Sequence, residues 1–271
     1  MRMRKKKNLI PRMERCAAIQ EKHPYDMPGK WRERMMPDCK LHLEIGCGKG
    51  SFTVETAAAH PDTLFVAVER VPDCLLLAME KVMARGLTNV VFVCDDAARL
   101  GEMFAPGEVD LMYINFCDPW PSKRHAKRRL TFETFLLSYR TFMRDGGRIE
   151  FKTDNRPLFD FSLTQFTRAG YQLSEVTNDL HRETSGVIQT DYEARFVAEG
   201  VKINRCVAMK LPEVPEPMGE PPKLSLLDYL PEEMDHIPYG MEVILEQNQI
   251  RLGREQERAG TECCSDDLET E

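Results

Sequence analysis

Residues Leu41–Gly50 read Leu-His-Leu-Glu-Ile-Gly-Cys-Gly-Lys-Gly. The first five carry Leu41, Leu43 and Ile45 at alternate positions and predict a short buried strand, and residues 51–60 carry apolar side chains at helical spacing. Between these two runs, Gly46, Gly48 and Gly50 allow the backbone to turn sharply and to approach a ligand closely. A strand that passes through such a turn into a helix predicts an α/β fold with a ligand at the strand ends.

The same alternation of strand and helix continues to about residue 210. Strands are expected at 41–45, 64–68, 90–93, 109–114, 148–152, 171–177 and 203–209, and helices at 51–60, 72–85, 129–143 and 157–168. Because strands joined through helices pair in parallel, this order predicts a mostly parallel, seven-stranded sheet with helices on both faces. The last two strands are close enough along the chain to pair antiparallel at one edge.

Four segments are expected along the chain. They are a basic N-terminal arm and lead-in at 1–40, the α/β domain at 41–210, a linker at 211–223 and an acidic C-terminal extension at 224–271. Five prolines set the linker apart and favour an extended backbone. Residues 224–252 keep Leu, Ile and Met for a small docked segment, whereas residues 254–271 have the composition of a disordered tail.

The charge is distributed unevenly. The formal net charge is −7, but residues 211–271 hold 4 basic and 16 acidic side chains, a net −12. Residues 1–210 therefore hold 33 basic and 28 acidic side chains, a net +5. A mildly basic body with an acidic tail favours a polyanionic partner.

Several classes of protein are disfavoured by composition. There is no apolar run of 18 residues, and the basic N-terminus lacks the apolar stretch of a secretory signal. The nine cysteines include no Cys-x-x-Cys pair, and the spacing of His42, His125 and His181 matches no metal site. We therefore expect a cytoplasmic protein with reduced thiols, no membrane span and no bound metal.

Acidic residues flank the glycine turn and follow the next strands. Glu44 precedes the turn, Glu69 ends the second strand about twenty residues later, and Asp95-Asp96 and Asp118 follow the third and fourth strands. An acid at the end of the second strand can accept both ribose hydroxyls, and an acid before the turn suits an amino group. The spacing Gly-x-Gly-x-Gly differs from that of dinucleotide folds. These features indicate a nucleoside ligand with an ammonium and no phosphates, and S-adenosylmethionine fits that description.

A second motif begins at the last of these acids. Residues 118–129 read Asp-Pro-Trp-Pro-Ser-Lys-Arg-His-Ala-Lys-Arg-Arg. Pro119 and Pro121 restrict the backbone on either side of Trp120, next to Asp118, and a run of cations follows. The cations are Lys123, Arg124, Lys127, Arg128 and Arg129, with Arg2, Arg4 and Lys5–Lys7 as a second basic group. We interpret them as a phosphate clamp beside the ligand site, although a loop before a solvated helix is an alternative.

These motifs, together with Phe151–Asn155 and Thr190–Phe196, resemble the bacterial tRNA (guanine-N7-)-methyltransferases, the TrmB family. The resemblance covers residues 41–210 and the basic N-terminal arm. It implies a Rossmann-like class I methyltransferase fold that uses S-adenosylmethionine. It also implies methylation of guanine N7 at position 46, in the variable loop of tRNA.

The resemblance also implies roles for individual residues. Cofactor contacts would come from Glu44, Gly46, Gly48, Gly50, Glu69, Asp96 and Asp118, with Asp118 also catalytic. Substrate contacts would come from Ser122, Lys123, Arg124, Lys127, Arg128, Arg129, Asp154, Thr190, Asp191, Tyr192 and Glu193. The family often carries Lys where this chain has Ser122, so either Lys123 replaces that contact or the contact is missing.

Other interpretations stay open at this stage. Thr190 and Glu193 also have the spacing of a helix capping box, and one residue of Asp95-Asp96 can cap a helix. The fold could serve a methyltransferase for a small molecule or a protein, or an RNA-binding module without activity. A nicotinamide dehydrogenase fits the glycine spacing poorly. The chain could be a monomer or a homodimer.

Overall fold

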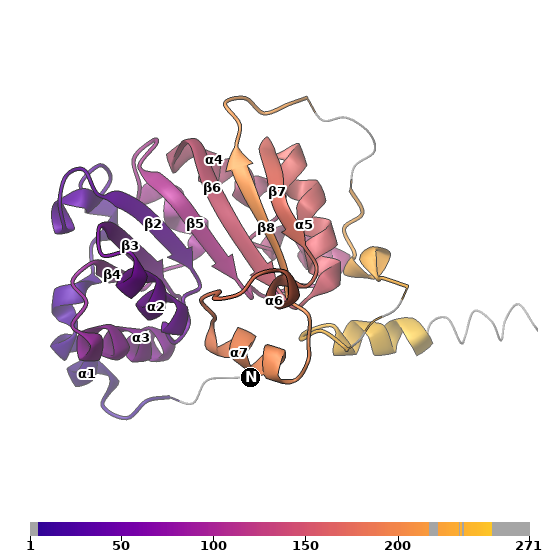
Figure 1. The fold of residues 1–271 in the computed structure, drawn as a ribbon, viewed down its shortest axis with the longest axis horizontal. Helices are drawn as coiled ribbons and strands as arrows, with labels where there is room; N and C mark the ends of the chain where they lie inside the picture. The colour runs from indigo at the N-terminus through magenta and orange to yellow at the C-terminus, as the bar shows by residue number, and fades with distance from the viewer. Residues whose placement is uncertain (1–4, 217–221, 233, 235, 251–271) are drawn as a thin grey trace, which may run out of the picture.

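The computed structural model describes residues 5–216, 222–232, 234 and 236–250. Arg2 and Arg4 of the basic arm, and the predicted disordered tail at 254–271, lie outside these residues. Within the described residues, eight strands form one sheet in the order β1-β4-β3-β2-β5-β6-β8-β7 (Figure 1). The strands are β1 (Gln20–Glu21), β2 (Lys40–Ile45), β3 (Thr63–Val68), β4 (Val90–Val93), β5 (Val109–Asn115), β6 (Met143–Thr153), β7 (Tyr171–Thr177) and β8 (Asn204–Lys210).

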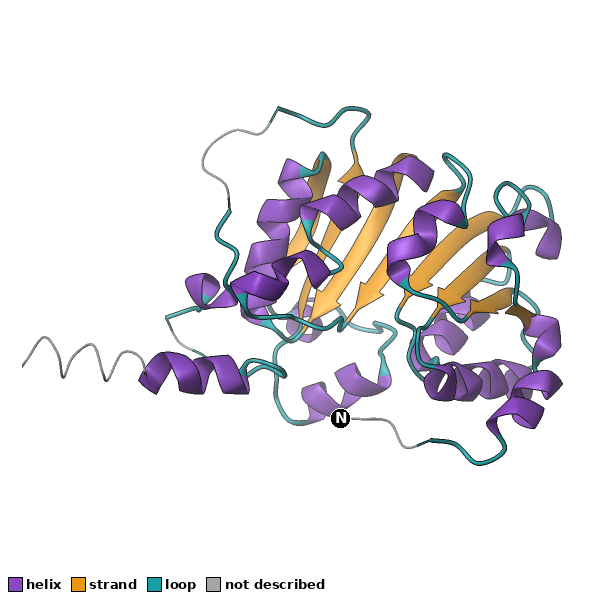
Figure 2. Ribbon diagram, turned by 180° about the vertical axis from the view of Figure 1, so that it is seen from behind, coloured by secondary structure: helices purple, strands orange, loops and turns teal. Residues whose placement is uncertain are grey.

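Helices cover both faces of this sheet (Figure 2). The α-helices are α1 (Leu9–Arg15), α2 (Ser51–Ala59), α3 (Pro72–Arg85), α4 (Glu133–Phe142), α5 (Arg156–Arg168), α6 (Leu180–Glu183) and α7 (Asp191–Ala198). Short 3-10 helices lie at η1 (Ala17–Ile19), η2 (Pro24–Asp26), η3 (Trp31–Arg34), η4 (Ala97–Glu102), η5 (Lys123–Arg128) and η6 (Leu226–Tyr229). Residues 242–250 form a further helix. None of the helices in the described part of the chain is long and apolar enough to cross a bilayer.

The alternation of side chains along the strands builds two hydrophobic cores. In β3, Leu64, Val66 and Val68 face the core under α4 and α5, whereas Phe65 and Ala67 face the core under α2 and α3. Successive side chains of a strand point to opposite faces, so an almost entirely apolar strand must be covered on both sides. This confirms the predicted Rossmann-like α/β class.

The predicted strands are confirmed, with one addition. All seven expected strands are present, and β8 pairs antiparallel with both β6 and β7. The addition is β1, which pairs in parallel with β4 at the opposite edge. Its two residues are too few to show an alternating pattern, which explains why the sequence pointed to seven strands instead of eight.

The N-terminal segment also packs on the domain. Trp31 is fully buried, and its indole N–H donates to the carbonyl of Met103 at 2.7 Å. On α1, the Arg12 guanidinium makes a two-point contact with the Glu80 carboxylate of α3, at 2.8 and 2.6 Å. The lead-in to the domain is therefore tied down by a buried aromatic ring and by a bidentate ion pair.

Candidate active site at the carboxyl edge of the sheet

A cleft of about 670 Å³ lies where β2, β3, β4 and β5 end. Its lining includes a residue from each strand end, namely Gly46, Glu69, Asp96 and Asp118. The carboxyl ends of parallel strands meet at the same edge of the sheet, which brings these residues together from distant parts of the chain. The volume is within the range of small-ligand sites. We call this cavity the strand-end cleft.

Glu69 lines the cleft and fixes the backbone on two sides of it. One carboxylate oxygen accepts a hydrogen bond from the backbone N–H of Gly48 at 3.0 Å, and the other accepts from Val71 at 2.8 Å. Glu69 thus joins the glycine turn to the start of α3. A carboxylate offers about four lone-pair sites, so Glu69 keeps capacity for a hydroxyl-bearing ligand.

Glycine is required at the three positions of the turn for different structural reasons. Gly46 and Gly48 adopt positive φ angles of 74° and 56°, and a Cβ atom on either would meet nothing within 4 Å. A Cβ atom on Gly50 would lie 2.5 Å from Cβ of Ala78 on α3. The missing side chain of Gly50 therefore allows α2 and α3 to pack closely, and its predicted contact with the cofactor stays a prediction.

Glu44 lies beneath the turn and does not line the cleft. Its carboxylate is buried and accepts a hydrogen bond from the Thr53 hydroxyl at 2.5 Å. Burial raises the pKa of Glu44 to about 7, against the opposing effects of that hydrogen bond and of the Lys152 charge. A buried acid at this position costs stability, which is a mark of functional sites. Its predicted contact with a ligand ammonium stays a prediction.

The two aspartates after β4 have separate partners. Asp95 accepts a hydrogen bond from the Tyr25 hydroxyl. Asp96 caps η4 by accepting from the backbone N–H of Ala98 at 3.0 Å, and its other oxygen lies 3.5 Å from the Arg70 guanidinium. The capping interpretation therefore holds for Asp96. Both aspartates also line the strand-end cleft, so a cap and a ligand contact are compatible at Asp96.

Asp118 stands in an unusual stretch of backbone. Phe116 and Trp120 on either side adopt positive φ angles of 51° and 44°, which side chains other than glycine rarely adopt. Such strain persists only where the surroundings enforce it, and it clusters at active sites. Asp118 is exposed toward the cleft, and Trp120 forms part of the wall beside it.

Arg129 holds this strained stretch of backbone in place. Its buried guanidinium donates to the carbonyls of Pro119 and Trp120, at distances from 2.8 to 3.1 Å, and to the carbonyl of Leu224 at 2.9 Å. The guanidinium also lies 4.3 Å from the centroid of the Phe161 ring. Because Arg129 is 0% exposed, the prediction that it contacts RNA is corrected: it holds the loop that presents Asp118.

The other four cations of the run are exposed. Lys123, Arg124, Lys127 and Arg128 lie on the single short helix η5. Lys127 and Arg128 border the strand-end cleft, and the Arg128 guanidinium lies 4.9 Å from the Trp120 ring centroid. Ser122 precedes η5 but makes no side-chain cap. The basic surface and the acidic cleft therefore meet at one loop.

Asp154 lies at the end of β6 and lines a second cavity instead of the strand-end cleft. Its side chain is buried, and burial raises its pKa. The carboxylate oxygen Oδ2 lies 3.8 Å from Nε2 of His236, which belongs to the C-terminal extension. That contact was not visible in the sequence, where His236 carries no motif.

The Thr190–Glu193 motif is a helix start with an internal charge pair. Thr190 and Glu193 form the complete capping box of α7. The Glu193 carboxylate is 0% exposed and binds the Lys152 ammonium at 2.6 Å and the His181 ring at 2.9 Å. This corrects the prediction that Glu193 contacts substrate, because its oxygens serve a buried lysine.

The middle of this motif faces outward. Tyr192 is 59% exposed. Asp191 accepts a hydrogen bond from the Ser51 hydroxyl at 2.5 Å and lies 3.3 Å from the Lys81 ammonium. Asp191 therefore links α7 to α2 and α3 near the glycine turn. The predicted substrate contacts of Asp191 and Tyr192 stay predictions.

The fold and the cleft define a class I methyltransferase. Among solved structures, a 16S rRNA methyltransferase, KamB, matches with a TM-score of 0.55 at 15% identity over 68% of this chain and 93% of that one. An antibiotic related methyltransferase matches with a TM-score of 0.51 at 18% identity over 67% and 92%. At these identities the likeness establishes the fold. The family model described as "Putative methyltransferase" matches residues 38–206.

Curated relatives identify the family. The tRNA (guanine-N(7)-)-methyltransferase of Lactococcus lactis subsp. cremoris strain MG1363 is 40% identical over 216 residues, which cover 79% of this chain and 100% of the relative. Its namesake in Geobacillus kaustophilus strain HTA426 is 43% identical over 70% of this chain and 88% of the relative. The chain belongs to the bacterial tRNA (guanine-N7-)-methyltransferase family, as its motifs indicated.

Proposed function

We propose that this protein transfers a methyl group from S-adenosylmethionine to N7 of a guanine in tRNA, at position 46 of the variable loop. The observation that carries the proposal is the position of Asp118. Asp118 lines an acidic cleft of nucleoside size, and the exposed cations of η5 follow it a few residues later in the chain. Relatives at about 40% identity with this activity in their names support the substrate.

The residues of the strand-end cleft fit the proposed methyl donor. Glu69 and Asp96 are acceptors for hydroxyl and amino groups, and the open space above Gly46 admits a ligand against the backbone. Neither acid suits a diphosphate. When bound, the donor supplies an electrophilic methyl group on a sulfonium. Asp118 would hold its amino end, the guanine edge, or both.

The chemistry asks for positioning more than for acid–base catalysis. Guanine N7 carries a free lone pair, so the protein needs no general base. Holding N7 in line with the methyl group converts a bimolecular reaction into an effectively unimolecular one, which lowers a barrier by up to about 7–11 kcal/mol. The purine ring gains positive charge as the new bond forms, and the fixed carboxylate of Asp118 stabilises that charge.

The exposed cations would hold the RNA. Lys123, Arg124, Lys127 and Arg128 present four charges to phosphates beside the cleft. Lys123 stands next to Ser122 and would take the place of the lysine that the family often has there. The target guanine must leave its stack to reach the methyl group, as bases do in other base-modifying enzymes.

A transfer assay tests this proposal. Unmodified tRNA and free guanosine monophosphate are each incubated with labelled methyl donor and with the wild-type or Asp118→Ala protein. We expect methylation of tRNA alone, and a loss of about 10²–10³-fold or more in Asp118→Ala. Circular dichroism and the urea unfolding midpoint control for folding. Equal labelling of the free nucleotide, or a near-normal rate in Asp118→Ala, would show the assignment to be wrong.

A further inference from the structure

The N-terminal lead-in runs beside the strand that carries the acids Asp95 and Asp96. Its two-residue strand β1 extends the sheet, with Glu21 opposite Val93 at the end of β4. Because the two strands are parallel, both segments continue toward the carboxyl edge of the sheet, where the strand-end cleft lies. The eighth strand, which the sequence did not reveal, therefore brings the lead-in to the side of the cleft that these two acids line.

Tyr25 makes the contact between the lead-in and this side of the cleft, although it lies before the residues that the family model matches. It belongs to η2, where the buried Pro24 restricts the backbone just before it. The Tyr25 ring packs on the core under α4 and α5, and the Arg99 guanidinium of η4 lies 4.1 Å from the ring centroid. These contacts fix where the ring lies, and with it the position of the hydroxyl.

The lead-in is also anchored on the far side of Tyr25. The backbone N–H of Gly29 donates to the Glu108 carboxylate at 3.0 Å. The Arg32 guanidinium donates to the carbonyl of Cys39 at 2.8 Å and to the Asp110 carboxylate at 3.0 Å. The segment that carries Tyr25 is therefore held by β1 before it and by these contacts after it. A hydroxyl on such a segment is a preorganised donor.

The Tyr25 hydroxyl donates a hydrogen bond to Oδ2 of Asp95. Burial of the phenol, together with this hydrogen bond, raises the pKa of Tyr25 to about 12, so the hydroxyl keeps its proton at neutral pH and remains a donor. The other oxygen of Asp95, Oδ1, accepts from the backbone N–H of Asp96 at 2.7 Å. One carboxylate therefore ties the lead-in to the backbone of Asp96.

Asp95 and Asp96 bring two adjacent carboxylates into the lining of the same cleft. Like charges at this separation repel each other, so each carboxylate needs a partner that sets its direction. Both oxygens of Asp95 are engaged by the protein, through Tyr25 and the Asp96 backbone. By contrast, Oδ2 of Asp96 lies 3.5 Å from the exposed Arg70 guanidinium and keeps lone pairs for a ligand. The two acids therefore have different tasks, one structural and one directed at the cleft.

We propose that Tyr25 is a positioning residue of the methyl-donor site and that it acts through Asp95. By holding the Asp95 carboxylate, Tyr25 fixes the backbone at Asp96 and directs the Asp96 carboxylate at the amino or hydroxyl groups of the donor's nucleoside. This inference rests on the proposed function for the identity of the donor. It gives the lead-in a part in cofactor affinity that is separate from methyl transfer and from RNA binding.

The test measures binding of S-adenosylmethionine to the full chain by calorimetric titration without RNA, and then kcat and both KM values in tRNA methylation. Tyr25→Phe removes the hydroxyl and keeps the ring beside Arg99. Asp95→Ala removes the acceptor, and the double variant shows whether the two residues act together. Tyr171→Phe is the matched control, because it removes a buried tyrosine hydroxyl that donates to the carbonyl of Leu136 at 2.9 Å, on β7 at the opposite edge of the sheet.

We expect Tyr25→Phe to weaken binding of S-adenosylmethionine about tenfold and to raise its KM by a similar factor, the effect of losing a hydrogen bond to a charged group. The kcat at saturating donor and the KM for tRNA should stay within about twofold, because the reacting groups are unchanged. Asp95→Ala should weaken donor binding at least as much, and adding Tyr25→Phe to it should cause no further loss. Tyr171→Phe should lower the urea unfolding midpoint and leave donor affinity within about twofold of the wild type.

The outcomes separate this inference from the proposed function. If the wild type methylates tRNA but Tyr25→Phe binds the donor as tightly as Tyr171→Phe does, Tyr25 has no positioning role and the proposed function stands. A loss in the double variant beyond that of Asp95→Ala would also overturn the inference, because Tyr25 would then act by another route. If donor binding depends on Tyr25 but the wild type methylates no tRNA, the proposed function fails and this inference stands. If the wild type does not bind the donor, both are overturned.

Discussion

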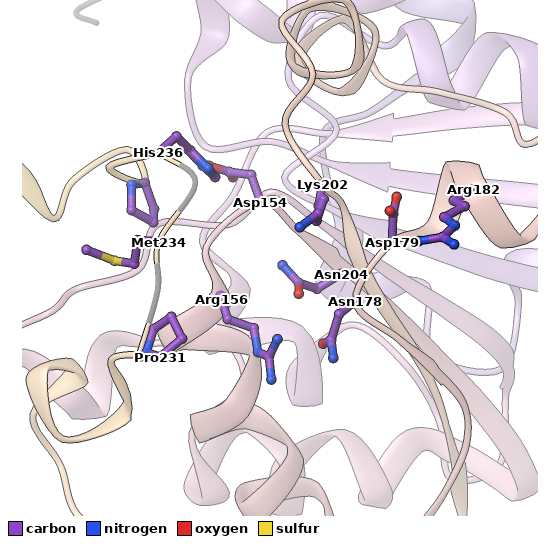
Figure 3. Close-up of a pocket in the computed structure, with 11 residues that line it drawn as sticks. Asp154, Arg156, Asn178, Asp179, Arg182, Lys202, Asn204, Pro231, Met234 and His236 are labelled. Atoms are coloured by element: carbon purple, nitrogen blue, oxygen red, sulfur yellow. The ribbon is translucent and has the colours of Figure 1, made fainter.

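The strand-end cleft lies at the same edge of one sheet as a second cavity, the extension pocket, which Asp154 and His236 line (Figure 3). Different kinds of contact form the two. Each acid of the cleft follows its own strand by a few residues, so short motifs place Glu69, Asp96 and Asp118. The extension pocket joins Asp154 to His236, which lies more than eighty residues further along the chain. Local motifs thus place the acids of the strand-end cleft, whereas long-range docking of the C-terminal extension forms the second cavity.

The largest loss of stability should come from removing the buried ion pair between Glu193 and Lys152. Glu193→Ala removes the capping box and leaves the Lys152 ammonium buried without its carboxylate, which costs about 3–5 kcal/mol of unfolding free energy. Urea unfolding measures the loss. Glu199→Ala, which breaks an exposed ion pair with Arg195 on the same helix, should cost about 1 kcal/mol or less. Similar small losses in both variants would contradict the structural role of Glu193.

A smaller, pH-dependent effect should appear beside the cleft. Glu44 has a folded pKa of about 7 against an ordinary value of 4.5, so folding is increasingly opposed as pH rises between these values. Glu44→Gln removes the titrating group. Relative to the wild type, this variant should gain about 2–3 kcal/mol of stability between pH 5 and pH 8. Unfolding curves at both pH values check this, and a gain that is the same at both would contradict it.

The same variant sharpens the contrast between stability and function. If Glu44 is kept because it serves the methyl donor, Glu44→Gln should bind the cofactor more weakly while being more stable at pH 8. Calorimetric titration with S-adenosylmethionine measures the affinity. A variant that is more stable and binds the cofactor normally would show that Glu44 has no part in the site.

The smallest effect per substitution is expected on tRNA affinity, when exposed cations of η5 are replaced. Reversing Arg124 and Arg128 to Glu should weaken tRNA binding and reduce the slope of log affinity against log salt by about 2, one for each lost phosphate contact. Arg85→Glu is the control, because Arg85 is exposed at the end of α3, away from the carboxyl edge. Unchanged affinity and slope in the double variant would contradict the phosphate clamp.

The sequence predicted those parts of the molecule that depend on neighbouring residues. Short strand-forming runs rich in apolar residues located seven strands, and the acids after them located the cleft. It could not distinguish an exposed cation from a buried one within a basic run, which is why Arg129 was misassigned. Nor could it show that Glu193 meets Lys152, because that pair forms only when α7 folds back onto β6.

The docking of the extension was beyond local patterns for the same reason. Leu226 and Gly240 contact the Asp-Pro-Trp-Pro loop across more than a hundred residues of chain, and Leu226 and Met241 are buried in the core. The spacing of these residues in the sequence does not indicate which segment they contact. A composition with Leu, Ile and Met allowed a docked segment, but only the tertiary structure brings His236 to Asp154.

The central claim is that the acid-lined cleft and the basic loop act on one guanine of tRNA. Mass spectrometry of nuclease fragments maps the methyl group after an unmodified tRNA transcript is incubated with protein and S-adenosylmethionine. We expect a single N7-methylguanine at position 46 of the variable loop, and no product when that guanine is replaced by adenine. Methylation at another base, or an undiminished yield from the adenine transcript, would contradict the claim.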